Sequence, residues 1–287
     1  MCDSDPRSFL VDTSVTRRSI VLALSSVAVT ACLPGAAHAA SVTETDVTVK
    51  TTDGLADAAL FQPAKRGKFP AVLLWPDILG LRPVFREMGR RLAAEGYVVL
   101  VPNPFYRTRK APIVTGPFDF GDKAAVAKLF VLKDTLTDAR VDSDIGAFVA
   151  FLDQQKQVDR RKGAGVQGYC FSGPFAFRAA ALLPARIKAV ATFHGGGLVT
   201  KEPNSPHLLI PRAKASFLVA IAQNDDKAQP KAKDDLKSAF AAAKRPATVE
   251  VYPGDHGWCV AGSQAYNEPA AERAWSALLK LYRANLT

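Results

Sequence analysis

The chain has 287 residues, which is enough for one large domain with a substantial hydrophobic core. Its composition, with 48% hydrophobic and 22% charged residues and only 19 Gly and 19 Pro, excludes an intrinsically disordered, collagenous or low-complexity protein. The formal net charge of +10 comes from dispersed Lys and Arg residues and no nucleic-acid-binding motif accompanies it, so we expect no nucleic acid partner. The positive charge still favours anionic small molecules or an anionic membrane surface.

The first 39 residues have the features of an export signal. Arg17 and Arg18 precede an apolar run over residues 19–31, which is shorter than a bilayer-spanning helix needs. A small-x-small cleavage site ends at Ala39, and the paired arginines resemble a twin-arginine signal, which exports a folded protein to the bacterial periplasm. We therefore expect residues 1–39 to be a twin-arginine-like export signal and the mature protein to be periplasmic or secreted.

A second interpretation of the leader stays open. The four residues that end at Cys32 resemble a lipoprotein cleavage box, in which Cys32 becomes the lipidated first residue. A chain processed there would be anchored to a membrane, and only in that case do we expect a membrane partner. The small-x-small site at Ala39 favours secretion over lipidation.

Cysteine residues are sparse after the leader. Cleavage after Ala39 leaves only Cys170 and Cys259. Two cysteines do not make a disulfide framework, although they can form one bridge in an oxidising compartment. The context of each thiol therefore has to decide between a bridge, a packed side chain and a reactive group.

Apolar runs of strand length alternate with amphipathic stretches along the rest of the chain. We expect strands at residues 47–52, 58–62, 71–75, 97–101, 166–168, 189–193, 217–222 and 249–252. We expect helices at residues 83–95, 142–155, 174–183, 231–243 and 269–284. No repeat or linker interrupts this alternation, so it predicts a single α/β domain over residues 40–287, with a mostly parallel sheet and helices on both faces.

Reactive side chains follow three of the expected strands. Cys170 lies in a turn rich in small residues between a strand and a helix, where the backbone can fold sharply and the helix dipole favours a thiolate. Asp225 and Asp226 follow the strand at 217–222, and His256 follows the strand at 249–252. Ligands bind outside the carboxyl ends of parallel strands, so we expect these groups to converge there.

Each of these features alone has a structural explanation, since an aspartate before a helix caps it and a loop histidine usually forms hydrogen bonds. Together they occur at successive strand ends in the order nucleophile, acid, base, which is the order found in α/β-hydrolases. A purely structural role does not predict this coincidence, so the order favours a catalytic triad.

The segments around these groups resemble a known family. Residues 168–173 (Gly-Tyr-Cys-Phe-Ser-Gly) and 252–257 (Tyr-Pro-Gly-Asp-His-Gly) are similar to the nucleophile elbow and the histidine loop of the dienelactone hydrolase, or carboxymethylenebutenolidase, family. Residues 75–80 (Trp-Pro-Asp-Ile-Leu-Gly) are similar to its oxyanion loop, and the resemblance extends over most of the chain after Asp46. It implies an α/β-hydrolase fold and an enzyme that opens esters and lactones.

The resemblance implies a Cys-Asp-His mechanism. Cys170 would attack the carbonyl and form an acyl-thioester, Asp225 would orient His256, and the N–H groups of Ile78 and Phe171 would form the oxyanion hole. Water would then hydrolyse the thioester with the histidine as base. We expect no cofactor and no metal, because the histidines of the chain show no ligand spacing and no phosphate or dinucleotide motif occurs.

Three further residues are expected to contact the thiol or the substrate. Asp77 stands where the family has an acidic residue that holds the resting thiol, and Arg107 stands where the family has an arginine that contacts the substrate carboxylate. Trp258 is expected either to floor the site or simply to pack. The chain departs from the family at Val260, where the best-known members have a second substrate arginine, and Asp226 stays open as the triad acid in place of Asp225.

Two other functions stay open from the sequence. Cys170 and Cys259 can form a redox pair in an exported thiol-disulfide protein, although no C-x-x-C motif is present. A binding protein that keeps the fold without turnover is the other alternative. The expected partner of the leading interpretation is a small ester or lactone, with an anionic one left open, and we expect a monomer.

Overall fold

The structure, a computed structural model, describes residues 41–287. The expected export signal over residues 1–39 and the alternative processing site at Cys32 lie outside the described residues and stay predictions. No helix in the described part of the chain is long and apolar enough to cross a bilayer.

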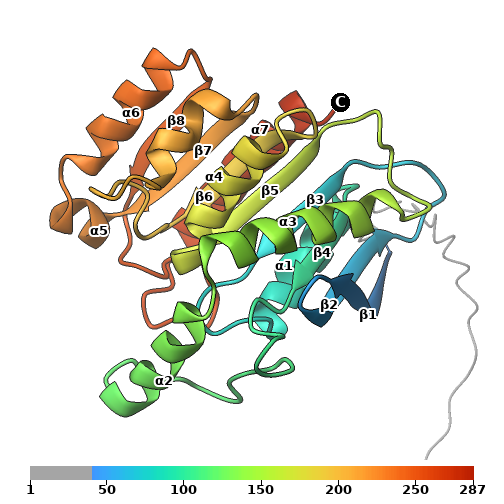
Figure 1. Cartoon of the computed structure of the whole chain (residues 1–287), viewed down its shortest axis with the longest axis horizontal. Helices are drawn as coiled ribbons and strands as arrows, with labels where there is room; N and C mark the ends of the chain where they lie inside the picture. Colours follow the sequence, from blue (N-terminus) through green and yellow to red (C-terminus); the bar gives the residue numbers. More distant parts are fainter. Residues whose placement is uncertain (1–40) are drawn as a thin grey trace, which may run out of the picture. The chain divides into compact units, whose positions relative to one another are not determined.

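Eight strands form one sheet in the order β1-β2-β4-β3-β5-β6-β7-β8 (Figure 1). The strands are β1 (Val42–Thr51), β2 (Gly54–Pro63), β3 (Ala71–Trp75), β4 (Val98–Pro102), β5 (Ala164–Tyr169), β6 (Ile187–Phe193), β7 (Ser216–Ala222) and β8 (Ala247–Tyr252). The hairpin of β1 and β2 joins the sheet through an antiparallel contact of β2 with β4, and all other pairs are parallel. The expected mostly parallel sheet is therefore confirmed.

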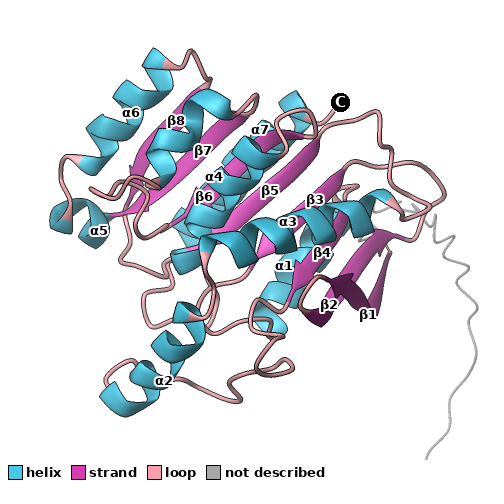
Figure 2. Ribbon diagram, viewed as in Figure 1, coloured by secondary structure: helices cyan, strands magenta, loops and turns pink. Residues whose placement is uncertain are grey.

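Helices cover both faces of this sheet (Figure 2). They are α1 (Pro83–Ala94), α2 (Lys123–Asp134), α3 (Asp138–Asp153), α4 (Gly173–Leu182), α5 (Gln223–Ala228), α6 (Ala232–Ala242) and α7 (Glu268–Asn285), with the short 3₁₀ helices η1 (Cys170–Ser172) and η2 (Pro206–Arg212). Side chains alternate between the faces along each strand, so Leu73 joins the core under α3, α4 and α6 whereas Leu74 joins the core under α1 and α7.

Two helices were not expected from the sequence. In α2 only Leu129 is buried, so the segment has little apolar periodicity, and its start is instead set by Asp122, whose carboxylate accepts hydrogen bonds from two N–H groups of the first turn. The other is α5, a helix of six residues with no buried side chain. Helix α3 also begins earlier than expected, at Asp138, because Thr137 caps it.

The topology brings three strand ends to one edge of the sheet. Strands β5, β7 and β8 run parallel, so their carboxyl ends lie on the same side. Cys170 follows β5 directly, α5 follows β7, and the loop with His256 follows β8. The fold therefore gathers the expected reactive groups at the edge where ligands bind in parallel sheets.

Candidate active site

Cys170 occupies a sharp turn between β5 and α4. Its φ angle is +57°, a left-handed conformation that is uncommon for a residue with a side chain and that clusters at functional sites. The turn needs glycine at position 168, because a Cβ atom there would clash with the carbonyl oxygen of Ser172. The Ser172 hydroxyl is buried and accepts a hydrogen bond from the N–H of Tyr169 at 2.9 Å. Ser172 thus fastens the turn and leaves Cys170 as its reactive side chain.

The imidazole of His256 lies between Cys170 and Asp225. Its Nδ1 donates a hydrogen bond to Asp225 Oδ2 at 2.8 Å, and one of its ring nitrogens lies within 4.8 Å of Cys170 Sγ. The backbone N–H of His256 donates to Asn224 Oδ1 at 2.8 Å, which ties the histidine loop to α5. The geometry therefore aligns a thiol, an imidazole and a carboxylate.

The short helix α5 separates the two candidate carboxylates. Consecutive helical residues point in different directions, so Asp225 reaches His256 while Asp226 pairs with Lys233 Nζ at 2.8 Å. Of the two alternatives that the sequence left open, only Asp225 contacts the imidazole.

Electrostatics at the site favour a charged imidazole. Burial lowers the pKa of His256, but hydrogen bonds with Asp225 and Cys170 and the negative charges of both groups outweigh it and raise the pKa to about 10. The neighbours of His256 therefore stabilise its charged form.

Two backbone N–H groups are candidate donors of an oxyanion hole. Phe171 is the second residue of η1, so its N–H has no acceptor within that helix, and Ile78 lies in the loop after β3. Outside the helices and strands of residues 41–287, neither N–H donates a backbone hydrogen bond. The sequence-based pairing of these two donors is thus compatible with the structure.

Comparison with known proteins identifies the family. The model of the dienelactone hydrolase family matches residues 56–286, which is most of the chain. The chain belongs to the dienelactone hydrolase family. Membership makes it a carboxylic-ester hydrolase with an α/β-hydrolase fold, as the resemblance of the three segments implied.

Relatives of this dienelactone hydrolase family member align with most of its length. A Methylorubrum extorquens protein named as a carboxymethylenebutenolidase is 27% identical over 98% of this chain and 97% of its own length. Carboxymethylenebutenolidase from Rhodococcus opacus is 27% identical over 77% of this chain and 83% of its own length. The solved structure of a Klebsiella pneumoniae protein named as a dienelactone hydrolase superposes with a TM-score of 0.73 at 23% identity, over 85% of this chain and 99% of that chain, which supports the fold.

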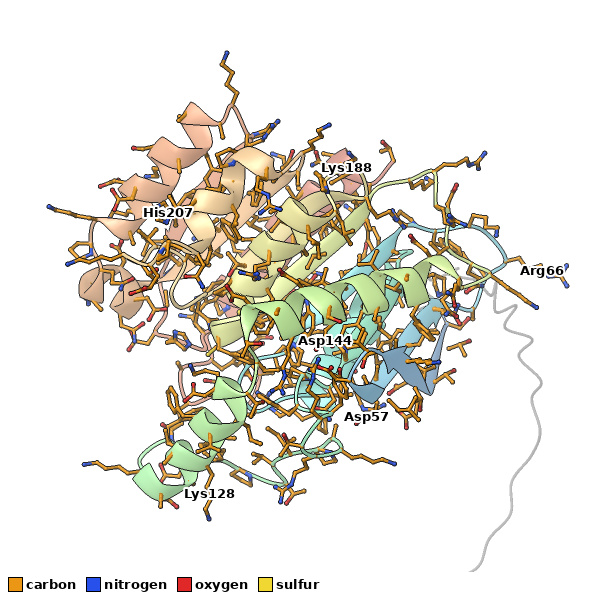
Figure 3. The ribbon with its side chains drawn as sticks, viewed as in Figure 1. Asp57, Arg66, Lys128, Asp144, Lys188 and His207 are labelled. Atoms are coloured by element: carbon orange, nitrogen blue, oxygen red, sulfur yellow. The ribbon has the colours of Figure 1, made fainter. Side chains whose placement is uncertain are left out.

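Arg107 is not free to bind a substrate carboxylate in this hydrolase. Its Nη1 and Nη2 donate to the two oxygens of Asp144 at 2.7 and 2.8 Å, and its Nε donates to Asp53 at 2.7 Å. Asp144 extends from α3 and is 1% exposed (Figure 3), so its carboxylate needs a counter-ion. The expected substrate contact is therefore not supported by the geometry, and Arg107 serves as that counter-ion.

Asp77 also has a partner other than the expected one. Both of its carboxylate oxygens accept hydrogen bonds from Arg82, and Oδ1 also accepts the N–H of Leu79 at 3.0 Å. The backbone carbonyl of Asp77 accepts the N–H of Gly80 at 2.8 Å, which closes the turn that contains Ile78. Asp77 thus holds the oxyanion loop in place, while a direct contact with the resting thiol is not part of this geometry.

Trp258 supports the histidine loop from inside the core. Its side chain is fully buried, and its ring stacks on Tyr252 with the centroids 4.7 Å apart. A fully buried ring does not line a surface that substrate contacts, so of the two expected roles the structure shows packing beneath the loop.

His194 also belongs to the site, although the sequence-based triad does not include it. It follows β6 with a φ angle of +40° and is 1% exposed. Burial and the neighbouring His256 hold the pKa of His194 well below its usual value. Its ring stands edge-on to that of His256, with the centroids 4.6 Å apart, and one ring nitrogen lies within 4.8 Å of Cys170 Sγ. The only signal in the sequence was its place directly after a strand of the same sheet.

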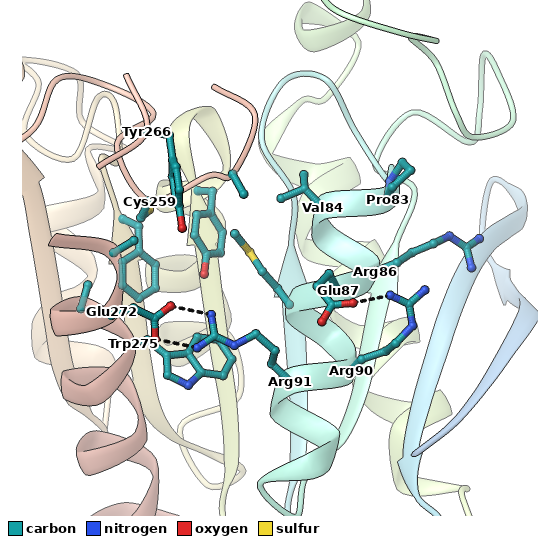
Figure 4. A pocket seen from close by; sticks show the side chains of 16 residues that line it. Pro83, Val84, Arg86, Glu87, Arg90, Arg91, Cys259, Tyr266, Glu272 and Trp275 are labelled. Atoms are coloured by element: carbon teal, nitrogen blue, oxygen red, sulfur yellow. Dashed lines mark hydrogen bonds and ion pairs between the residues drawn. The ribbon is translucent and has the colours of Figure 1, made fainter. Parts of the chain in front are cut away.

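A separate cavity of about 530 Å³ lies between α1 and α7 (Figure 4). Cys259 lines it, and its charged side chains form ion pairs, some within the cavity, as between Arg91 and Glu272, and some with residues outside it, as between Arg86 and Glu44. Cys170, Asp225 and His256 do not line this cavity. Cys170 and Cys259 are both free thiols, so the structure does not support the redox pair.

Proposed function

We propose that the protein hydrolyses small esters or lactones through a triad of Cys170, Asp225 and His256 with an acyl-thioester intermediate. The observation that carries the proposal is the line of contacts from the strained Cys170 through the imidazole to the Asp225 carboxylate, which His256 reaches at 2.8 Å. The family model over residues 56–286 supports the reaction class.

The first half of the reaction uses the imidazolium. The thiolate of Cys170 attacks the carbonyl carbon, and the N–H groups of Ile78 and Phe171 bind the oxygen as it becomes negative. Loss of one such donor costs about 3–4 kcal/mol in other hydrolases. When the intermediate collapses, the ester C–O bond breaks and His256 gives its proton to the leaving alkoxide.

The second half returns the proton. Once Cys170 is acylated, the negative charge that raised the pKa of His256 is gone, so the neutral imidazole can take a proton from water. The hydroxide attacks the thioester, the C–S bond breaks, and the thiolate and imidazolium form again. Asp225 holds the imidazole in one orientation through both steps.

The environment of the proposed site favours an apolar acyl group. Phe171 stacks on Phe105 with the centroids 5.8 Å apart, and both belong to an apolar cluster with Ile78 beside the oxyanion loop. Since Arg107 is occupied by Asp144, no family arginine is free for a substrate carboxylate. We therefore propose uncharged esters and lactones as the preferred substrates.

A panel of chromogenic esters and lactones tests the proposal. Cys170→Ala is expected to lower hydrolysis to a few per cent or less of the wild-type rate, while Cys259→Ala, the same change at the other free thiol, is expected to keep it. Full activity in Cys170→Ala would overturn the proposal and point to another nucleophile.

We also propose that residues 1–39 direct export, with cleavage after Ala39. The support is the paired arginines and the small-x-small site of the leader. Protein isolated from the periplasm is expected to begin at Ala40, and replacing Arg17 and Arg18 by lysine is expected to block export. A lipidated N-terminus at Cys32 would overturn the cleavage site.

A further inference from the structure

His194 places an unpartnered side chain beside the proposed triad. Both ring nitrogens are buried and make no hydrogen bond within residues 41–287. Buried polar groups are normally satisfied, and leaving one without a partner costs stability. One nitrogen faces a cluster in which the ligand atoms of Cys170, His194 and His256 all lie within 4.8 Å of one another. This arrangement points to a ligand that the triad alone does not explain.

We propose that Cys170, His194 and His256 form a Zn²⁺ site, and that zinc bound there reversibly inhibits the hydrolase. A thiolate with two imidazoles is a donor set that Zn²⁺ prefers. Bond lengths of about 2.3 Å to sulfur and about 2.1 Å to nitrogen place the ligand atoms roughly 3.5 Å apart, so the three groups need to approach by no more than about 1.3 Å. Three protein ligands leave the fourth tetrahedral position to water.

Asp225 supports the proposed site through its hydrogen bond with His256, without binding the metal itself. Metal-bound histidines usually donate their other ring N–H to a carboxylate, which fixes the ring and strengthens it as a ligand. His256 already donates Nδ1–H to Asp225 at 2.8 Å, so its other nitrogen is oriented towards the cluster. Metal binding would release the proton held by the Cys170 thiol or the His256 imidazolium, because Zn²⁺ takes its place on the ligand atom.

Inhibition follows because the metal occupies the atoms that the reaction needs. Zinc on the Cys170 sulfur prevents attack on the carbonyl, and zinc on His256 prevents proton transfer. This inhibitory consequence rests on the proposed function of the triad, whereas metal binding itself does not.

Metal binding is measured directly with Co²⁺ as the probe and Zn²⁺ as the competitor. The wild type is expected to bind one Co²⁺ with a thiolate-to-cobalt charge-transfer band that Zn²⁺ removes, and Cys170→Ala is expected to lose the band. His194→Asn, chosen because asparagine tolerates a positive φ angle, is expected to raise the zinc dissociation constant at least about tenfold. His207→Asn is the matched control, because His207 lies on η2 near α6, outside the cluster (Figure 3).

Inhibition is measured relative to the uninhibited rate of each variant. The half-inhibitory zinc concentration is expected to rise in His194→Asn by the same factor as the dissociation constant and to stay unchanged in His207→Asn. Equal zinc sensitivity in His194→Asn and wild type, or no charge-transfer band in wild type, would overturn the proposal.

X-ray absorption of the unmodified zinc-bound protein covers the case in which His194→Asn does not fold. One sulfur and two nitrogen ligands support the site, and any other protein donor set overturns it. If Cys170→Ala instead keeps full hydrolysis, the proposed function fails while the cobalt and absorption measurements still decide the metal site.

Discussion

Replacing Arg107 by methionine tests whether this side chain is a structural counter-ion or a substrate ligand. The side chain of Arg107 is 10% exposed and that of its partner Asp144 is 1% exposed. Removing one partner of a buried ion pair costs about 3–5 kcal/mol, because the other charge is left buried and unpaired. Tyr106 donates a remaining hydrogen bond to Asp144, so we expect a loss near the lower end, about 3 kcal/mol.

This loss has a measurable thermal effect and a matched control. For a domain of this size, about 3 kcal/mol lowers the melting temperature by roughly 6–12 °C. Arg273→Met removes the same side chain from an exposed pair with Glu250 and is expected to cost no more than about 1 kcal/mol. Circular dichroism during heating measures the melting temperature of both variants.

The loss of stability in Arg107→Met is also expected to depend on pH. Burial raises the pKa of Asp144 above its usual value despite the lowering effect of Arg107, so the native state binds this proton more tightly than the unfolded state does. Stability linked to such a group falls as pH rises. Without Arg107 the destabilisation is therefore expected to be smaller at pH 5 than at pH 8.

Substrate kinetics complete the test. In Arg107→Met the ratio of KM values for an anionic and a matched neutral ester is expected to stay at the wild-type value. An unchanged melting temperature together with a KM for the anionic ester raised tenfold or more would refute the structural role and restore the substrate contact.

Three further predictions concern the site. Asp225→Asn is expected to lower kcat by about 10⁴, whereas Asp226→Asn stays within tenfold of wild type, and the reverse order would move the triad acid to Asp226. The imidazole of His256, followed by NMR, is expected to titrate near pH 10 and at a lower pH in Cys170→Ala, since a hydrogen bond and a negative charge are lost; an unchanged value would contradict the ion pair. The free energy of folding that the charged His256 contributes is complete below the ordinary histidine pKa and is lost as pH rises through about 10. Asp77→Asn is expected to lower kcat by about 100-fold through a displaced oxyanion loop, and wild-type kcat would show that the loop keeps its position without Asp77.

The sheet could be predicted because its strands leave a clear pattern. All five residues of β3 are buried, which appears in the sequence as a continuous apolar run between polar segments. Helix α2 leaves no such pattern, since only Leu129 is buried and its start depends on the Asp122 cap. Burial against the core makes an element visible in the sequence, and α2 lacks that burial.

The convergence of Cys170, Asp225 and His256 could be predicted because parallel strands end at one edge of the sheet. The choice between Asp225 and Asp226 could not, because it depends on the direction of side chains on α5, whose six residues bury no apolar group. The roles of Arg107 and Asp77 depend on their partners, Asp144 and Arg82, which only packing brings together.

His194 shows the same limit. Its local sequence places it at a strand end, but nothing there indicates that both ring nitrogens are buried without a partner. The surroundings of the His194 ring depend on the histidine loop after β8, which lies next to the end of β6. This contact is visible only in three dimensions.

The most direct measurement of the central claim is the mass of the enzyme during turnover. Rapid acid quenching after mixing with a chromogenic ester is expected to trap a species heavier by one acyl group, with the added mass on the peptide that contains Cys170. The species is expected to disappear on treatment with hydroxylamine, as thioesters do, and to be absent in Cys170→Ala. An acyl group on another residue, or hydrolysis in Cys170→Ala at the wild-type rate, would contradict the account.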